Sequence, residues 1–114
     1  MVNTTSKGNR SVLRAIDYYT AGGWLVDRVE KKGQWVLEKD LFGLFDLVGV
    51  KKNEVLFIQV KTNQPATQKD YKLFAKRYGG TNVLVECYTW YDRRGPVIHH
   101  YHNDNVVTKE DLRK

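Results

Sequence analysis

Residues 45–62, FDLVGVKKNEVLFIQVKT, determine the fold expected for this chain. Two apolar runs flank the short polar turn Lys52-Asn53, and this pattern predicts two antiparallel strands joined by a tight turn. With the turn centred between these two residues, counting outward along both strands makes Asp46 face Gln59. Because both faces of the hairpin are otherwise apolar, we expect it to lie in a sheet that is covered on both sides.

The segments on either side of this hairpin alternate between helical and strand patterns. Before it, apolar residues recur at helical spacing up to Gly22-Gly23, and after it Thr67 can cap a second helix. The patterns predict, in chain order, a helix over 9–21, a strand over 24–29, the hairpin strands 45–51 and 54–62, a helix over 67–78, a second hairpin with strands 83–90 and 96–102, and a short terminal helix opened by a capping box at 108–111. Residues 30–43 give no clear prediction. This order predicts one α/β domain in which a mixed central sheet is flanked by helices.

The composition limits the chain to a few classes of protein. At 114 residues, with 41% hydrophobic and 28% charged residues, it fits one globular domain spanning 1–114 and is too short for two. The formal charge of +6 favours a polyanionic partner. Cys87 is the only cysteine, which excludes an intrachain disulfide, and no segment is typical of a signal peptide or a membrane span. We therefore expect a soluble, cytoplasmic protein without a membrane partner.

Three polar side chains stand at one end of the apolar hairpin. Asp46 and Gln59 face each other across the strands, and Lys61, two residues beyond Gln59, shares their face. The spacing leaves two interpretations open. Either the hairpin frays here and Asp46 pairs with Lys61, or the side-chain oxygens of Asp46 and Gln59 lie close enough to share one cation.

The same residues carry a resemblance to a known group of enzymes. The run Asp46-Leu47-Val48, followed by Leu56-Phe57-Ile58-Gln59-Val60-Lys61, resembles the active-site signature of the PD-(D/E)xK nuclease superfamily. The leading Lys7-Gly8, the first predicted helix and Gly23-Trp24-Leu25-Val26 are similar to the start of the archaeal-type Holliday junction resolvases, a family with cellular and phage members. The similarity runs through about Tyr78 and implies a restriction-endonuclease-like core.

The resemblance implies a Mg²⁺-dependent endodeoxyribonuclease that cuts four-way DNA junctions by phosphodiester hydrolysis, with Mn²⁺ as a substitute metal. The catalytic residues would be Asp46, Gln59 and Lys61. Asp46 would be the central metal ligand, assisted by the side-chain oxygen of Gln59 and the backbone carbonyl of Val60, while Lys61 would orient the attacking water and offset developing charge. Paired cuts across a junction need two active sites in one particle, which implies a homodimer. A phage member would act in the cytoplasm of its host.

The chain departs from the family pattern at two positions. Gln59 stands where the family usually has a carboxylate, and Val12 stands where the first helix usually carries a Glu. Because Mg²⁺ favours carboxylate oxygens, Glu38 or Asp40 is the candidate for an additional ligand, although both also fit a solvated loop. Gln59 is either a natural variant or an inactivating substitution. The alternatives to a resolvase are another structure-selective or restriction-like nuclease of the same fold, and a catalytically silent DNA-binding protein.

Basic side chains gather on the two predicted helices. Their functional interpretation is contact with DNA phosphates, and the alternative is an ordinary solvated helix face. The candidates are Lys7, Arg10 and Arg14 on or just before the first helix, and Lys69, Lys72, Lys76 and Arg77 on the second. Arg93 and Arg94, at the tip of the second hairpin, have the same two interpretations.

The remaining candidates are assigned structural roles. The cluster His99, His100 and His102 lacks a cysteine or carboxylate at a supporting spacing, so these residues are predicted to be exposed on a strand rather than to bind zinc. Cys87 is predicted to be a small buried hydrophobe. A dimer interface is expected to use exposed aromatic side chains from the set Tyr71, Phe74, Tyr88 and Trp90.

Overall fold

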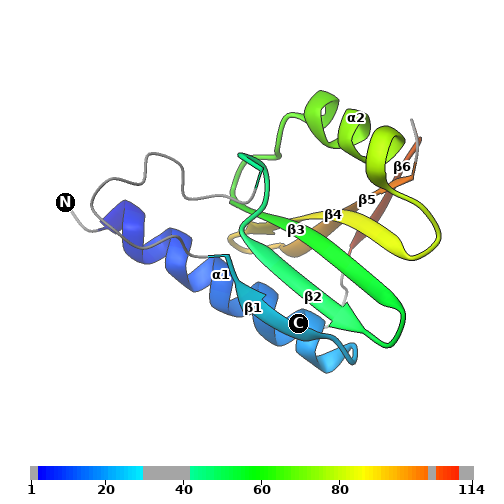
Figure 1. Ribbon diagram of the computed structural model, residues 1–114. Coiled ribbons are helices and arrows are strands. Elements are labelled where there is room, and N and C mark those ends of the chain that lie inside the picture. The colour runs from blue at the N-terminus through cyan, green and yellow to red at the C-terminus, as the bar shows by residue number, and fades with distance from the viewer. Residues whose placement is uncertain (1–2, 30–41, 103–104, 111–114) are drawn as a thin grey trace, which may run out of the picture.

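The computed structural model of the chain describes residues 3–29, 42–102 and 105–110, and of residues 3–8 and 110 it describes the backbone alone. Its elements, in chain order (Figure 1), are α1 (Asn3–Ala21), β1 (Leu25–Arg28), β2 (Leu47–Lys51), β3 (Glu54–Thr62), α2 (Gln68–Tyr78), β4 (Val83–Tyr91), β5 (Gly95–His102) and β6 (Asn105–Glu110). Neither described helix combines the length and the apolarity that crossing a membrane requires.

The strands of the described residues form one mixed sheet of six strands in the order β1-β2-β3-β4-β5-β6. The neighbours β3 and β4 run parallel, and every other neighbouring pair is antiparallel. β3 and β4 are parallel because the connection through α2 returns the chain to the end of the sheet at which β3 begins, and β4 starts there. The predicted class, an α/β fold with a mixed sheet flanked by helices, is confirmed.

The two helices cover opposite faces of the sheet (Figure 1). The core between α1 and the sheet consists of Ala15, Tyr19, Leu47, Leu56, Ile58, Val60, Tyr88 and Ile98. The core on the other face consists of Phe45, Tyr71, Ala75, Val85, Cys87 and Tyr101. Because successive strand residues alternate between faces, the even-numbered residues of β3 point toward α1, and the odd-numbered ones, including Gln59 and Lys61, point to the face that carries α2.

The hairpin predicted from the central stretch is confirmed. Lys51 pairs with Glu54 and Leu47 pairs with Ile58, which is the predicted register. The prediction that both of its faces are buried is wrong near the turn, where Val50 is 41% exposed. The reason is that α2 lies chiefly over β4 and β5, so it leaves the α2 face of β2 and β3 partly open.

The predicted start of the first helix and the predicted terminal helix are wrong. The first helix begins at Asn3 rather than at residue 9, because its polar first turns lie outside the apolar repeat that revealed the rest. The terminal segment also differs from the prediction. A capping box at 108–111 predicted a helix, but residues 105–110 form β6, which pairs with β5. Val106, Val107 and Thr108 are β-branched, and the unpaired edge of β5 offers backbone partners that a short isolated helix would not have.

Candidate active site

Asp46 lies where the chain enters β2. Its backbone N–H donates to the Ile58 carbonyl at 2.9 Å, and its neighbours Phe45 and Leu47 pack on opposite faces of the sheet. Residues two apart on a strand share a face, so the backbone bends at Asp46 instead of following the strand alternation. Its half-buried carboxylate is held by Val60, whose N–H donates to Oδ2 at 3.0 Å.

Gln59 reaches the same carboxylate from β3. One orientation of its amide would set the amide oxygen against Asp46 Oδ2 and the Leu44 carbonyl, which are both acceptors. In the other orientation the NH₂ group donates to Asp46 Oδ2 at 3.0 Å and to the Leu44 carbonyl at 2.6 Å, and this is the one that satisfies all three groups. The predicted juxtaposition of Asp46 and Gln59 is therefore confirmed, and Gln59 meets Asp46 as a hydrogen-bond donor.

Lys61 lies on the same face of the sheet, two residues after Gln59 along β3. It faces Thr89 across the parallel pair, and its side chain is half-buried. Within the described part of the chain Lys61 has no hydrogen-bond or ion-pair partner, so the ion pair with Asp46 that the spacing left open is not formed.

The pKa of Cys87, on the α2 face of β4, depends on burial and on nearby charges. Burial raises the pKa of its thiol to about 12, and a hydrogen bond with Tyr101 opposes that rise. The charges of Asp46 and Glu86 raise the same pKa further, while the charge of Lys61 lowers it. At neutral pH Cys87 is a protonated, buried thiol, as predicted, and not a nucleophile.

The described residues offer a metal ion one carboxylate and one backbone carbonyl. Val60 turns its N–H toward Asp46, and in a strand the carbonyl of the same residue leaves from the same edge. Mg²⁺ is usually held by one or two carboxylates, with water and substrate phosphate oxygens as its other ligands, so this donor set fits Mg²⁺. No group of three or more His, Cys, Asp or Glu side chains that could hold a metal occurs among the described residues. Glu38 and Asp40 lie outside them.

Val12, where the resemblance predicted a Glu, packs against the core under α1. That core lies on the face of the sheet opposite Gln59 and Lys61. A carboxylate at position 12 would therefore have to reach round the end of β3 to join them. At that end of β3 the hydroxyls of Ser11 and Thr62 form a hydrogen bond, at 2.6 Å.

The predicted DNA-binding residues fall into two groups on opposite faces of the sheet. On α2, which shares the face of Asp46, Lys69, Lys76 and Arg77 are exposed and Lys72 is half-buried. On α1, Arg10 and Arg14 are exposed, and the guanidinium of Arg14 lies 4.2 Å from the ring centroid of Trp90. Only the backbone of Lys7 is described. The structure therefore does not unite the seven predicted residues on one surface.

The turn between β4 and β5 is fastened to the end of β3. The side-chain amide of Asn63 donates to Asp92 Oδ2 at 3.0 Å, and the backbone N–H of Asp92 donates back to Asn63 Oδ1 at 2.9 Å. Trp90 Nε1 donates to the other oxygen of Asp92 at 3.2 Å. These contacts hold the exposed tip residues Arg93 and Arg94 in a defined position beyond Lys61.

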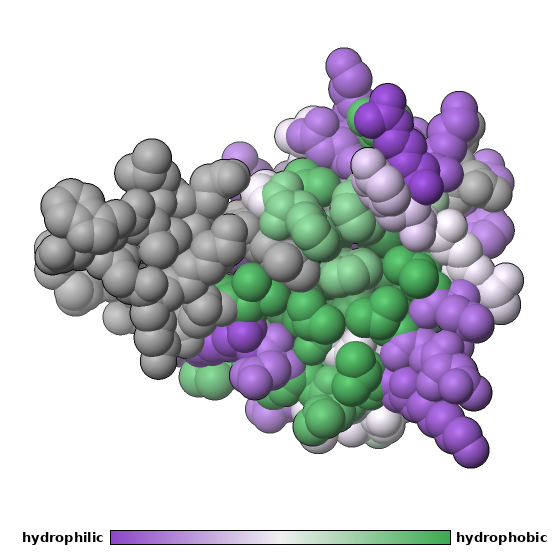
Figure 2. All heavy atoms as spheres, in the orientation of Figure 1, coloured by the Kyte–Doolittle hydropathy of each residue, from purple (hydrophilic) through white to green (hydrophobic). Residues whose placement is uncertain are grey.

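An apolar hollow lies on the α2 face beside the active-site residues. It has a volume of about 500 Å³ and is lined by Phe42, Leu44, Phe57, Phe74 and Tyr78. Figure 2 shows apolar side chains gathered on this face, below the hydrophilic surface of α2. Its rim includes Phe42 and Tyr78, 61% and 62% exposed. Of the four aromatic residues from which a dimer interface was expected to draw its exposed members, Tyr71 and Tyr88 are buried in the two cores, and only Phe74 and Trp90, both half-buried, reach the surface.

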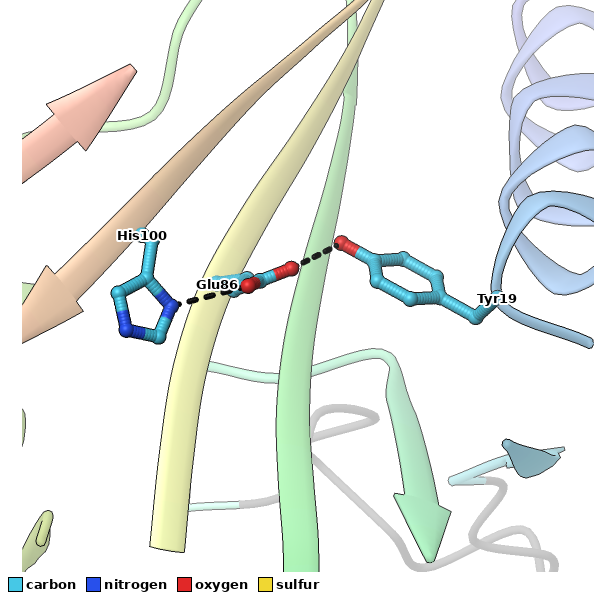
Figure 3. A network of polar contacts seen from close by, with 3 residues as sticks. All are labelled: Tyr19, Glu86 and His100. Atoms are coloured by element: carbon cyan, nitrogen blue, oxygen red, sulfur yellow. Dashed lines mark hydrogen bonds and ion pairs between the residues drawn. The ribbon is translucent and has the colours of Figure 1, made fainter. Parts of the chain in front are cut away.

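A buried network on the α1 side escaped the sequence analysis. Glu86 of β4 accepts a hydrogen bond from the Tyr19 hydroxyl at 2.8 Å and lies 2.9 Å from Nδ1 of His100 (Figure 3). The prediction that the histidines are simply exposed is therefore wrong for His100, which is half-buried and has a carboxylate partner. The sequence feature that could have predicted this network is Glu86 itself, because a single acidic residue buried in an apolar strand needs hydrogen-bond or ion-pair partners. His99 points to the opposite face, where burial lowers its pKa.

Comparison of the chain with models of known protein families and with curated proteins found no match.

Proposed function

We propose that the protein is a metal-dependent DNA endonuclease of the Holliday junction resolvase type, built on a restriction-endonuclease-like core. The observation that carries the proposal is the single carboxylate of Asp46, held by the Val60 N–H and by Gln59, with Lys61 on the same partly open face. The order of the elements, with a crossover helix between the parallel strands β3 and β4, supports it.

The metal proposed for this site is Mg²⁺, with Mn²⁺ as a substitute. Asp46 and the Val60 carbonyl would hold it, and a phosphate oxygen of the substrate would complete the site. When bound, the metal would polarise the scissile phosphate and lower the pKa of a bound water. The contribution of Gln59 is a donated hydrogen bond that fixes the direction of the Asp46 carboxylate.

Lys61 is the cation of the proposed site. Its half-buried ammonium group has no anionic partner among the described residues, so its charge is available to a substrate phosphate. A fixed positive charge next to a phosphate that gains negative charge in the transition state accelerates the reaction. Lys61 would also orient the attacking water.

The distribution of basic residues favours a branched substrate. One straight duplex laid against Asp46 would meet the cations of α2 but not those of α1, because the two helices cover opposite faces. The arms of a four-way junction leave in several directions, so different arms can reach both groups. Simultaneous cuts in two strands require a second active site, and we therefore propose that the protein acts as a homodimer. The proposed location is the cytoplasm.

The second candidate function is DNA binding without cleavage. It is favoured by one observation: the described site contains one carboxylate where Mg²⁺ enzymes of this kind often use two, since Gln59 occupies the position facing Asp46. A nuclease of the same fold with another DNA substrate is the third.

One experiment distinguishes the three. The purified protein is incubated with end-labelled four-way, forked and linear duplex DNA, with Mg²⁺ and with a chelator. A resolvase gives symmetric, Mg²⁺-dependent nicks on the four-way junction alone. Cleavage of forks or of linear duplex would identify another nuclease, and binding without any cleavage would leave the silent DNA-binding protein.

A further inference from the structure

A second pocket lies on the face of the sheet that carries α1, opposite the side chains of Gln59 and Lys61. This α1 pocket has a volume of about 340 Å³ and is lined by Arg14, Asp17, Tyr18, Ala21, Tyr88, Trp90 and Pro96. It forms because α1 lies chiefly over β1 and β3 and leaves the end of β4 and the start of β5 uncovered on this face. Its size lies in the range of small-ligand sites, near the lower end.

The α1 pocket contains two aromatic rings that are fixed by their neighbours. Trp90 Nε1 donates to Asp92 Oδ1 at 3.2 Å, and the Arg14 guanidinium lies 4.2 Å from the Trp90 ring centroid. The ring of Tyr18 packs against that of Tyr88, with 5.6 Å between the centroids. Trp90 and Tyr18 are only half-buried, so part of each ring is accessible to a ligand. Nucleobases stack on accessible aromatic side chains of this kind.

The polar groups of the α1 pocket supply both hydrogen-bond donors and acceptors. Arg14 and Asp17 are exposed, and neither forms a hydrogen bond or an ion pair with another residue that the structure describes. The edge of a nucleobase carries acceptors that Arg binds and amino groups that Asp accepts from. A purely apolar ligand would use neither side chain. The combination of aromatic walls with a donor and an acceptor therefore favours a nucleobase.

Two further exposed cations flank the α1 pocket. Arg10 lies one helical turn before Arg14 on α1, and Arg93 follows Asp92, the residue that holds Trp90, in the turn between β4 and β5. Arginine side chains at such positions bind phosphates without regard to sequence. A base that is attached to a sugar-phosphate strand would use these cations, whereas an isolated base would not.

We infer that the α1 pocket binds an unpaired nucleobase of single-stranded nucleic acid, with the base against Trp90 and Tyr18 and the adjoining phosphates on the arginines. A paired duplex keeps its bases stacked on one another, so it does not offer this ligand. The inference goes beyond the proposed cleavage, because the α1 pocket lies on the other face of the sheet and binding there requires no metal.

Binding to a short oligothymidylate and to an abasic strand of the same length tests the inference. The two strands carry the same phosphates, so electrostatic attraction alone would bind them equally. Fluorescence anisotropy on the full chain should show that the oligothymidylate binds about fivefold more tightly or better. Equal affinities would overturn the inference. Displacement of the oligothymidylate by an equal concentration of thymidine monophosphate would overturn the assignment to a strand, because a free nucleotide would then be the ligand.

Trp90→Leu should remove most of this preference, by lowering the affinity for the oligothymidylate about fivefold or more while the abasic strand binds nearly as before. Trp24→Leu is the matched control. Trp24 is also half-buried and has a cation over its ring, Lys51 Nζ at 4.6 Å, but it does not line the α1 pocket. Equal losses for the two variants, or equal losses on the two strands, would overturn the role of Trp90.

Ala21→Gln tests the α1 pocket without altering the core, in case Trp90→Leu does not fold. Ala21 is the exposed last residue of α1 and lines the pocket, so a larger neutral side chain should obstruct it. The affinity for the oligothymidylate should fall toward that for the abasic strand. Thr20→Gln, at an exposed neighbour that does not line the pocket, should leave the preference intact. An undiminished preference in Ala21→Gln would move the base away from the pocket. These measurements need no cleavage, so they decide the inference even if the protein cuts no DNA.

Discussion

Among the described residues, the backbone of Val60 and the amide of Gln59 both donate a hydrogen bond to the same oxygen of Asp46, Oδ2. Two donors on one oxygen fix the plane of the carboxylate and strengthen its acceptor role, since bonds to an ionised group are the stronger kind. A carboxylate held in this way on a partly open face is preorganised to bind a cation. The orientation of the Asp46 carboxylate thus depends on the backbone position of Val60 as much as on the side chain of Gln59.

Asp46→Ala should abolish cleavage of the junction and leave binding nearly unchanged, because phosphate contacts from Lys and Arg dominate DNA affinity. The substitution also leaves the Val60 N–H and the Gln59 amide without their acceptor, which should lower stability by about 1 to 3 kcal/mol. Asp46→Asn, which keeps the size, is the control that separates lost charge from lost folding. Single-turnover cleavage and gel-shift titration measure the two effects. Cleavage at the wild-type rate by either variant would remove Asp46 from the site.

Gln59→Glu should make stability depend on Mg²⁺. Without metal, the new carboxylate would face Asp46 Oδ2 and the Leu44 carbonyl, both acceptors, at distances where Gln59 now donates. Repulsion of this kind destabilises the apo protein unless a proton or a cation intervenes. Adding Mg²⁺ should restore the melting temperature of the variant. The variant should also bind Mg²⁺ more tightly than the wild type does, because Mg²⁺ prefers carboxylate ligands.

Thermal melts of wild type and Gln59→Glu across a Mg²⁺ titration measure this change, and cleavage at limiting Mg²⁺ accompanies them. If cleavage rises from near nothing, Gln59 is an inactivating substitution. If it rises slightly, another acid such as Glu38 or Asp40 already serves the metal. A fall in cleavage with unchanged metal binding would leave Gln59 the purely hydrogen-bonding role that its amide orientation indicates.

At the scale of elements, α1 is joined to β4 by the buried pair of Tyr19 and Glu86. Burial, and then the charge of Glu86, raise the pKa of the Tyr19 hydroxyl well above 10. Above pH 10 the unfolded chain therefore releases a proton that the folded chain retains, so this group's contribution to stability is complete below pH 10 and is lost as pH rises.

Tyr19→Phe should cost about 1.5 to 3 kcal/mol at neutral pH through the lost hydrogen bond to the Glu86 carboxylate. It should also reduce the alkaline loss of stability by about 1.4 kcal/mol per pH unit, the slope contributed by one proton. Burial also raises the pKa of Tyr101 and of Cys87, so some alkaline loss remains in the variant. Urea unfolding at pH values from 8 to about 11 measures the slope. An unchanged slope would mean that Tyr19 ionises as readily in the folded state as in the unfolded one.

The elements also differ in how far the sequence predicts them. The hairpin register follows from a two-residue turn between apolar runs, so the facing of Asp46 and Gln59 could be worked out before the structure. The contact of Glu86 with His100 was missed, because the second hairpin has a three-residue loop after Tyr91, which determines the strand register less strictly than a two-residue turn does. The strand β6 could not be predicted, since its partner edge exists only once β5 has formed. Local patterns predict turns and periodic faces, and long-range pairing decides the rest.

The two basic helices should contribute differently to DNA binding. Lys69→Ala and Lys76→Ala on α2 should each reduce the salt slope of junction binding by about 0.9 of a unit, one phosphate contact each. Arg14→Ala on α1 should reduce it on a four-way junction but not on a linear duplex, if a second arm supplies its phosphate. Fluorescence anisotropy at several salt concentrations measures the slopes. Equal losses for Arg14→Ala on both substrates would place α1 and α2 on one duplex and remove the argument for branching.

At the scale of the whole molecule, paired cutting requires two copies, and the apolar hollow beside α2 is the surface we expect to join them. Tyr78 and Phe42 are exposed at its rim, and burial of aromatic side chains is a common source of interface stability. Tyr78→Asp would place a charge in that interface and should convert a dimer into a monomer at micromolar concentration. Leu13→Asp, at a residue that is 48% exposed on α1, is the matched control and should leave the dimer intact.

Light scattering measures the mass of both variants, and a junction assay in supercoiled plasmid measures paired against single cuts. A monomeric Tyr78→Asp protein should still nick one strand, because the site of Asp46 lies within a single chain, but should lose the paired product. A wild type that is monomeric without DNA would count against a preformed dimer. A Tyr78→Asp protein that remains dimeric and cuts in pairs would move the interface away from the hollow, and the exposed aromatic rim would then need another explanation.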